Sequence, residues 1–225
     1  MNLETELIEH QLREIRAEYL RRMTGGEGAL LRQVEEYSAG RTGKMLRPRM
    51  LLASSAEEPL SHRTLLLATA VEMLHNASLL HDDVIDRDLT RRGQPSVNAQ
   101  WNNSIAILVG DYHLVSIMQL LGEIGDNEVT QKFTTTVKSM VEAELLQQEP
   151  STKHLTLDTY LKIIDGKTAN LFALAAELGN PRYRDYGLHY GRLFQLRDDI
   201  ADGEATPFTA DLIAQEEKLL QEINL

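Results

Sequence analysis

Apolar residues recur at intervals of three and four along almost the whole chain, which is the spacing of one face of an α-helix. Ile8, Leu12, Ile15 and Tyr19 form one such stripe, and another runs from Ile164 to Leu178. The strict alternation of apolar and polar residues that is typical of strands is nearly absent. The pattern predicts an all-α protein.

Glycine and proline divide this pattern into segments of helical length, because these residues interrupt regular structure. The breaks fall at Gly25-Gly26, Gly43, Glu58-Pro59, Gly93-Gln94-Pro95, Gly125-Asp126, Pro150, Asn180-Pro181 and Gly203 to Pro207. The segments between them predict about eight helices. Ser61 and Asp126 are candidate helix caps, and Thr206 followed by Pro207 predicts a helix whose first residue is the proline.

Composition narrows the class of protein. The 225 residues, 42% of them hydrophobic, predict one sizeable core in a single domain over 1–225. A net charge of -11 disfavours nucleic acid or anionic lipid as a partner. The chain has no cysteine and no secretory pattern at its start, so a cytoplasmic location is expected. The longest strongly apolar stretch, from Leu65 to Leu80, is interrupted by Glu72 and His75, which predicts a buried helix and no membrane span.

An acidic cluster follows this apolar stretch. Helical spacing places Asp82 and Asp86 on one face, which also carries His75 and Ser78. Like charges four residues apart destabilise a helix, and carboxylates beside an apolar face are costly to desolvate. Mg²⁺ would offset both effects, because it binds oxygen ligands and completes its shell with water and substrate phosphates. The alternative is a solvated helix end, with Asp83 and Asp86 pointing to water.

A second acidic cluster, Asp198-Asp199-Ile200-Ala201-Asp202, also ends a helical segment and has the same carboxylate spacing. The repetition favours a metal clamp over two solvated helix ends. A calcium loop that starts at Asp198 is excluded, because Ile200 and Thr209 occupy positions where it needs an oxygen ligand and a glutamate.

Three short basic groups accompany the acidic clusters. In an acidic chain, such groups predict sites for a bound polyanion. Taken singly, each also has a simpler explanation, as a helix cap or as a partner of a carboxylate such as Asp86 or Asp88. A P-loop ending at Lys167-Thr168 is excluded, because Leu161 stands where a glycine is required. The groups are Gly43 to Arg49, Arg91 to Gly93, and Gly166 to Thr168.

These motifs, in this order, resemble those of the trans-prenyl diphosphate synthase family. That family shows Gly-Lys-x-x-Arg-Pro, Asp-Asp-x-x-Asp followed by Arg-Arg-Gly, Lys-Thr, and Phe-Gln-x-x-Asp-Asp-x-x-Asp, and all of them occur between Gly43 and Asp202. The resemblance implies an isoprenoid-synthase-type helical bundle around a central cavity, with the aspartate motifs facing each other, usually in a homodimer. It also implies Mg²⁺-dependent condensation of isopentenyl diphosphate with an allylic prenyl diphosphate to give a longer trans-polyprenyl diphosphate.

The resemblance implies a role for each matching residue. The magnesium ligands would be Asp82, Asp86, Asp198, Asp199 and Asp202. Isopentenyl diphosphate would contact Lys44, Arg47, His75 and Arg92, and the allylic diphosphate would contact Arg91, Lys167, Thr168 and Gln195. The residues most directly involved in catalysis would be Asp82, Asp83, Asp86, Lys167 and Asp198.

Side chains that precede the first aspartate motif bear on product length. Ala77 and Ser78 lie about one helical turn before Asp82, and Val71 and Leu74 lie deeper along the same helix. No bulky aromatic side chain closes the pocket at the level of Ala77 and Ser78. We therefore expect a product longer than farnesyl diphosphate.

The chain departs from the family pattern in two places. His113 stands where the family usually has an apolar residue. After the second motif the family usually continues with a glycine-lysine loop and several helices, whereas here Gly203 to Pro207 lead into one amphipathic segment, with no lysine before Lys218. The main alternative is therefore a catalytically weak or inactive subunit that works with a partner chain in a heteromer. A terpene cyclase or head-to-head synthase would leave the pattern from Gly43 to Pro48 unexplained.

Overall fold

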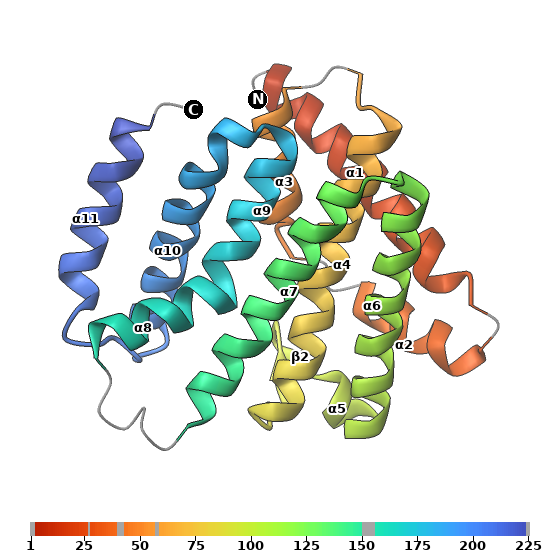
Figure 1. Ribbon diagram of the computed structural model, residues 1–225. Coiled ribbons are helices and arrows are strands. Elements are labelled where there is room, and N and C mark those ends of the chain that lie inside the picture. Colours follow the sequence, from red (N-terminus) through yellow and green to blue (C-terminus); the bar gives the residue numbers. More distant parts are fainter. Residues whose placement is uncertain (1–2, 27, 40–42, 57–58, 150–155, 224–225) are drawn as a thin grey trace. The chain divides into compact units, whose positions relative to one another are not determined.

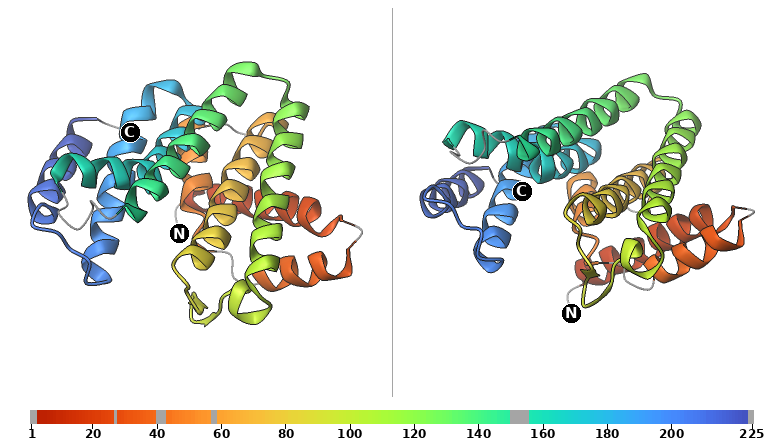
Figure 2. Two further views of the ribbon diagram at one scale, coloured as in Figure 1. Left: turned by 60° about the horizontal axis from the view of Figure 1, so that its bottom comes forward. Right: turned by 90° about the horizontal axis from the view of Figure 1, so that it is seen from below.

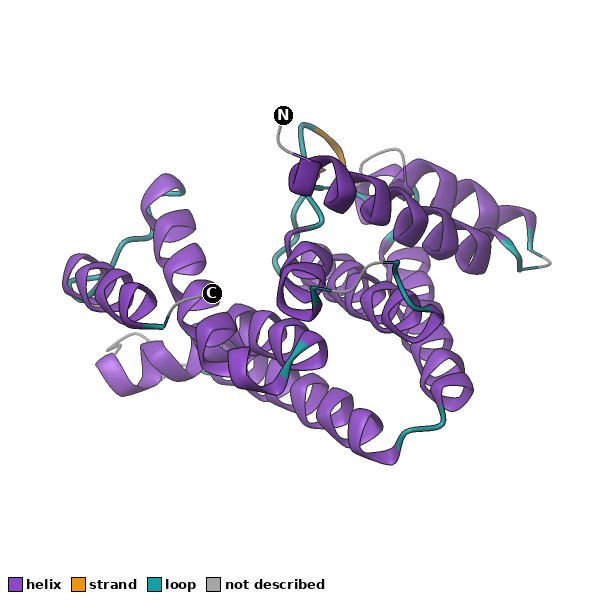
Figure 3. Ribbon diagram, turned by 90° about the horizontal axis from the view of Figure 1, so that it is seen from above, coloured by secondary structure: helices purple, strands orange, loops and turns teal. Residues whose placement is uncertain are grey.

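A computed structural model describes residues 3–26, 28–39, 43–56, 59–149 and 156–223. Helices account for nearly all of them (Figure 3), so the all-α prediction is confirmed. The α-helices are α1 (Leu3–Thr24), α2 (Ala29–Ala39), α3 (Leu46–Ser55), α4 (His62–Ile85), α5 (Val97–Gln100), α6 (Asn103–Ile124), α7 (Asn127–Gln148), α8 (Leu157–Ile164), α9 (Asn170–Gly179), α10 (Arg184–Ala201) and α11 (Thr209–Glu222).

Short elements account for the difference from the expected helix number. The described residues contain eleven α-helices, a π-helical turn η2 (Asp165–Ala169) and a 3₁₀ turn η3 (Pro181–Tyr183). A two-stranded hairpin pairs β1 (Thr90–Arg91) with β2 (Gln94–Pro95). The count of about eight was too low, because α5 is a single turn and the π turn between α8 and α9 has no proline to mark it.

The helices form two compact units, one of Met1–Leu52 with Glu57–Asp126 and the other of Ala53–Ala56 with Asn127–Leu225. The first aspartate motif belongs to the first unit and the second motif to the second. A single domain around a central cavity therefore stays a prediction, as does the face-to-face arrangement of the two motifs.

In the first unit, α4 packs against α1 and α6 (Figure 1). The hydroxyl of Ser61 accepts a hydrogen bond from the Thr64 backbone N–H at 3.1 Å, which confirms the predicted cap of α4. Toward its other end, Leu80 joins an apolar cluster that also contains Val34 and Val97. Burying a large apolar side chain contributes about 1.5–3 kcal/mol. This packing holds the end of α4 on which the first aspartate motif lies.

Helix α6, not the stretch from Leu65 to Leu80, is the most membrane-like segment. Among the described residues, it alone is long and apolar enough to cross a membrane by length and composition, and 44% of its apolar stretch is buried within the protein. Core helices meet the same criterion. Its packing against α4 accounts for much of its apolar character.

In the second unit, α10 lies beside both α9 and α11 (Figure 2). The ring of Phe172 on α9 meets the rings of Tyr190 and Phe194 on α10 at centroid distances of 5.2 and 5.5 Å. The prediction that a helix begins at Pro207 is wrong, because α11 begins at Thr209. The Thr209 hydroxyl instead accepts a hydrogen bond from the Thr206 backbone N–H, which keeps Pro207 in the preceding turn.

Candidate active site

The first acidic cluster lies at the C-terminal end of α4. Asp82 is partly exposed, and Asp86, which caps the helix, is exposed. Asp83 is only 4% exposed and accepts two hydrogen bonds from the guanidinium of Arg91, one of them from Nε at 2.7 Å. Burial raises the pKa of Asp83, while Arg91 acts in the opposite direction. The cluster thus has two outward carboxylates and one inward carboxylate that fixes Arg91.

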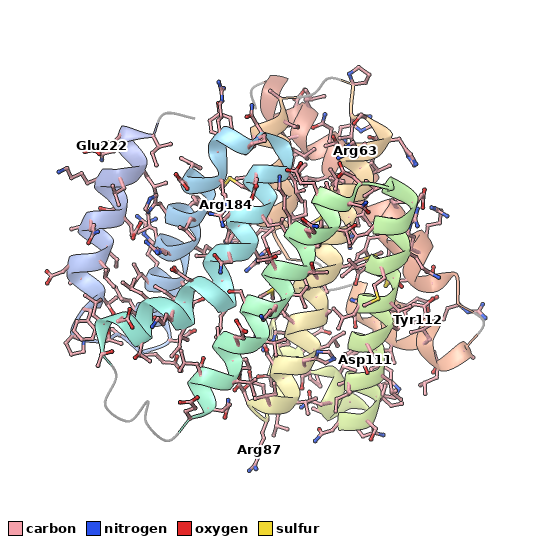
Figure 4. The ribbon with its side chains drawn as sticks, viewed as in Figure 1. Arg63, Arg87, Asp111, Tyr112, Arg184 and Glu222 are labelled. Atoms are coloured by element: carbon pink, nitrogen blue, oxygen red, sulfur yellow. The ribbon has the colours of Figure 1, made fainter. Side chains whose placement is uncertain are left out.

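The hairpin after α4 fixes the directions of two adjacent arginines. Arg91 pairs with Gln94 across the hairpin, and both connecting residues, Arg92 and Gly93, have positive φ values of 54° and 76°. Two positive φ angles are typical of a type I′ turn, which suits a tight hairpin. Arg91 also reaches Asp88 at 3.2 Å, so the simpler explanation of an ion pair with Asp88 is confirmed for this residue. The preceding Arg87 projects away from the end of α4 (Figure 4).

Gly43 and Arg92 are brought together although they are distant in the sequence. A Cβ atom on Gly43 would lie 2.5 Å from Nη2 of Arg92, so a larger residue would displace the guanidinium. The glycine of the first basic motif therefore makes room for the second arginine of the hairpin. Lys44, next in the chain, is exposed.

Arg47 and His75 form a pair between α3 and α4. The Nη1 atom of Arg47 lies 3.2 Å from Nε2 of His75, and the arginine is only 8% exposed. Burial lowers the pKa of His75 well below its usual value, and the charges of Arg47, Arg92 and Arg91 lower it further. Because an arginine has only donors, the neutral imidazole accepts the hydrogen bond at Nε2. The neutral imidazole therefore adds no second positive charge beside Arg47.

Sequence reasoning missed the acid beneath this pair. Glu72 on α4 is 2% exposed, and its carboxylate accepts a hydrogen bond from Asn76 at 3.3 Å. Burial raises its pKa to about 7, against the opposing effects of Arg47, Asn76 and Arg92. The signal was an acidic residue within a strongly apolar helical stretch.

The unusual His113 has a partner. Its Nε2 atom lies 2.7 Å from Oε1 of Glu35, and the two side chains are 1% and 0% exposed. A small cavity of about 50 Å³ beside it is lined by Ser38, Asp83 and Arg92, among others. The departure from an apolar residue at position 113 is thus matched by an acid on α2.

The second acidic cluster divides in the same way as the first. Asp198 and Asp202 at the end of α10 are exposed, whereas Asp199 is 7% exposed. Asp199 accepts a hydrogen bond from Gln195 Nε2 at 2.7 Å with one carboxylate oxygen and one from the Tyr160 hydroxyl with the other. Both of its oxygens therefore have a protein donor.

The π-helical turn η2 presents Lys167 and Thr168. Gly166 allows this turn to approach α7, since a Cβ there would lie 2.2 Å from Cβ of Ala143. Thr168 donates a hydrogen bond to Gln195 Oε1 at 2.6 Å, and Lys167 Nζ lies 2.8 Å from Oε2 of Glu144. Next to them is a cavity of about 310 Å³, lined by Lys167, Gln195, Asp199, Tyr160, Glu204 and Thr206, among others.

The structure thus brings the predicted residues together in two groups, one in each unit. Within the described parts of the chain, three or more His, Asp or Glu side chains nowhere gather closely enough to hold a metal ion by themselves. Each motif offers its two outward carboxylates. The first group is Lys44, Arg47, His75, Asp82, Asp83, Asp86, Arg91 and Arg92, and the second is Lys167, Thr168, Gln195, Asp198, Asp199 and Asp202.

Comparison with known proteins places this geometry in context. Residues 28–214 match the family model described as polyprenyl synthetase. The chain is 41% identical over 187 residues to the all-trans-nonaprenyl-diphosphate synthase (geranyl-diphosphate specific) of Rhodobacter capsulatus. That match covers 77% of this chain but only 57% of the relative.

Two solved structures share the fold. A decaprenyl diphosphate synthase from Rhodobacter capsulatus superimposes with a TM-score of 0.81 at 31% identity, over 90% of this chain and 69% of that one. A polyprenyl synthase from Caulobacter crescentus, complexed with calcium and isoprenyl diphosphate, also gives 0.81 at 32% identity, over 86% of this chain and 62% of that one.

Proposed function

This chain belongs to the polyprenyl synthetase family and has the helical fold of isoprenoid synthases, and from this premise we propose that it is a prenyltransferase. It would condense isopentenyl diphosphate with an allylic prenyl diphosphate to give a longer trans-polyprenyl diphosphate. The observation that carries the proposal is that each unit combines two outward carboxylates with cations held by other side chains. Two diphosphate substrates require both, because cations bind phosphate oxygens and carboxylates bind the accompanying metal ions.

Magnesium fits the donors that the two motifs present. Mg²⁺ is usually held by one or two carboxylates, with water and substrate phosphates in its remaining positions. Asp82 and Asp86 would supply them in one motif, and Asp198 and Asp202 in the other. When bound, Mg²⁺ would neutralise charge on the departing diphosphate. The relative complexed with calcium and isoprenyl diphosphate supports the use of a divalent ion.

The predicted set also included Asp199 as a metal ligand. Its carboxylate already accepts hydrogen bonds at both oxygens. We therefore give the four outward aspartates the role of binding metal and give Asp199 a different role, which is developed below.

The proposed chemistry begins with heterolysis of the allylic carbon–oxygen bond. Lys167 and the second Nε2 hydrogen of Gln195 would donate hydrogen bonds to the diphosphate and stabilise the charge that grows on it, while Thr168, whose hydroxyl donates to Gln195, would orient that amide. Arg91 would do the same while Asp83 holds its guanidinium in place. The double bond of isopentenyl diphosphate then attacks the allylic cation, and a proton passes to the released diphosphate. Exclusion of water is essential, because water would quench the cation.

The isopentenyl diphosphate would bind in the first unit. Arg47 and Arg92 would each supply a guanidinium, which matches the geometry of phosphate oxygens. Lys44 is exposed and would supply a third cation. Because Nε2 of His75 accepts from Arg47, its other ring nitrogen carries the proton and is the one able to donate to substrate.

We propose a product longer than farnesyl diphosphate. Ala77 is buried on α4 one turn before Asp82, and Val71 and Leu74 are buried further along the helix. The hydroxyl of Ser78 donates to the carbonyl oxygen of His75, so it is directed at its own helix and adds little bulk. The names of the similar nonaprenyl and decaprenyl synthases agree with a long product.

An exposed apolar face on α6 supports a homodimer. Leu108, Val115 and Met118 are 62%, 52% and 68% exposed. Their spacing places them on one side of the helix. Exposed apolar side chains gathered on one face are typical of protein interfaces. We propose that a second copy covers this face and that the protein works in the cytoplasm, with α6 as a core helix.

Product analysis tests this function. The protein would be incubated with Mg²⁺, isopentenyl diphosphate and either geranyl, farnesyl or geranylgeranyl diphosphate, with a chelator and Asp82→Ala as controls. We expect elongated products that disappear in both controls. No product with any primer would contradict an autonomous enzyme and favour the alternative of a weak subunit that works with a partner chain.

A further inference from the structure

A chain of hydrogen bonds runs through the second unit beneath the proposed allylic site. Thr168 Oγ1 donates to Gln195 Oε1 at 2.6 Å, and Gln195 Nε2 donates to Asp199 Oδ1 at 2.7 Å. The Tyr160 hydroxyl donates to Asp199 Oδ2. The amide of Gln195 is thereby fixed at both ends, so its orientation depends on a carboxylate that Tyr160 holds in place.

Tyr160 is itself held firmly. It is 5% exposed on α8 and packs with Ile164, Leu196 and Leu212 in one apolar cluster. Burial raises the pKa of its phenol, and Asp199 raises it further, so the hydroxyl stays protonated and able to donate. A buried donor of this kind is costly to leave without its acceptor.

The same tyrosine contacts the segment in which the chain departs from the usual family pattern. Thr206 lines the same cavity as Tyr160, the side chains of Thr209 and Thr206 oppose the rise in the pKa of its phenol, and Leu212 of α11 packs in its cluster. The C-terminal end of α10 and the start of α11 thus meet at one phenol. The glycine-lysine loop that usually follows the second motif in the family does not follow it here. The contact with Tyr160 supports the second motif in its place.

We infer that Tyr160 and Asp199 are positioning residues for the allylic diphosphate, an inference that rests on the proposed function. They hold the Gln195 amide at the wall of the cavity of about 310 Å³ that Lys167 also lines, and Thr168 fixes that amide from its other end. Asp199 acts through its two hydrogen bonds and not as a metal ligand. The buried member of the second aspartate motif therefore organises the substrate contacts beside it.

Tyr160→Phe tests this inference, because it removes one hydroxyl and retains the packed ring. We expect the KM for the allylic diphosphate to rise about tenfold, which corresponds to the loss of a hydrogen bond to a charged group. The KM for isopentenyl diphosphate should stay within about twofold, since its proposed contacts lie on α3, α4 and the hairpin. Tyr186→Phe is the matched control, because its ring stacks on Tyr190 outside this network, and it should leave both constants unchanged.

A double-mutant cycle adds a test of the pathway. Asp199→Asn breaks the network at its centre, so the effects of Tyr160→Phe and Asp199→Asn on the allylic KM should be clearly less than additive. Additive effects would overturn the inference, as would a Tyr160→Phe enzyme whose two KM values change equally or not at all.

Direct binding separates this inference from the proposed function. Calorimetric titration with geranyl diphosphate and Mg²⁺ should give a Kd about tenfold weaker for Tyr160→Phe than for the wild type. If the wild type makes no product, the proposed function fails, yet this ratio still supports the inference. Equal Kd values, or no binding by the wild type, overturn it, even if Tyr160→Phe lowers the melting temperature.

Discussion

Replacing Gly166 by alanine should destabilise the second unit and displace the turn that carries Lys167 and Thr168. The added Cβ would lie 2.2 Å from Cβ of Ala143 and 2.8 Å from the carbonyl oxygen of Ser139. Neither atom can rotate away, because one is bonded directly to the α7 backbone and the other belongs to it. Since carbon atoms normally touch at about 3.5–4.0 Å, the turn or α7 must shift. Such overpacking costs about 1–3 kcal/mol.

Thermal unfolding followed by circular dichroism measures this cost. At about 2–4 °C per kcal/mol for a chain of this size, Gly166→Ala should lower Tm by about 2–12 °C. Gly122→Ala is the matched control, because nothing lies within 4 Å of a Cβ added there in α6. Alanine favours a helix over glycine by about 0.5–1 kcal/mol, so this control should keep or raise Tm.

The same substitution has a functional consequence. Displacement of Lys167 and Thr168 should raise the KM for the allylic diphosphate more than the KM for isopentenyl diphosphate. A Gly166→Ala protein with an unchanged or higher Tm would refute the reasoning, because the close approach of the π turn to α7 would then not constrain position 166.

Three further predictions concern other parts of the structure. Arg91→Met should lower the free energy of unfolding in urea by about 2–3 kcal/mol, because it leaves buried Asp83 without its partner. Adding Asp83→Asn should recover part of that loss. An equal loss in the single and the double variant would contradict the pairing. The pKa of Glu72 in the folded protein is raised to about 7. The stability contributed by this shift is therefore fully present below the unfolded pKa and is lost as the pH rises to the folded pKa. The stability of the wild type relative to Glu72→Gln should therefore fall by about 2 kcal/mol between pH 5.5 and 8.5, whereas parallel unfolding curves would exclude the shift. Met118→Glu should convert a dimer to a monomer in sedimentation experiments, and an unchanged mass would place the interface elsewhere.

Much of the helical architecture could be predicted from residue patterns. The breaks near Gly25 and Gly125 and the cap at Ser61 agree with the ends of α1, α6 and the start of α4. Local chemistry determines these features, since a cap or a breaker acts within a few residues. The π turn was not predictable in this way, because it depends on the approach of Gly166 to Ala143, which is a contact between distant segments.

The candidate site shows the same division. Motif spacing placed Asp82 and Asp86 on one face of α4, because helical geometry alone decides this, whereas the burial of Asp83 was not foreseen. The hydrogen bonds that Asp83 and Asp199 accept could not be predicted from the sequence. Their donors, Arg91 and Tyr160, belong to a hairpin and to another helix. Tyr160 carried no motif of its own and is identified only by the carboxylate that it contacts.

The most direct test of the central claim is the number of isopentenyl units that the protein adds to one primer. Radiolabelled isopentenyl diphosphate and unlabelled geranyl diphosphate would be supplied with Mg²⁺, and the products would be separated by chain length. The account predicts labelled products longer than farnesyl diphosphate from the wild type and none from Asp82→Ala or in the presence of a chelator. Labelled product that persists in the chelator, or no labelled product from the wild type, would contradict it.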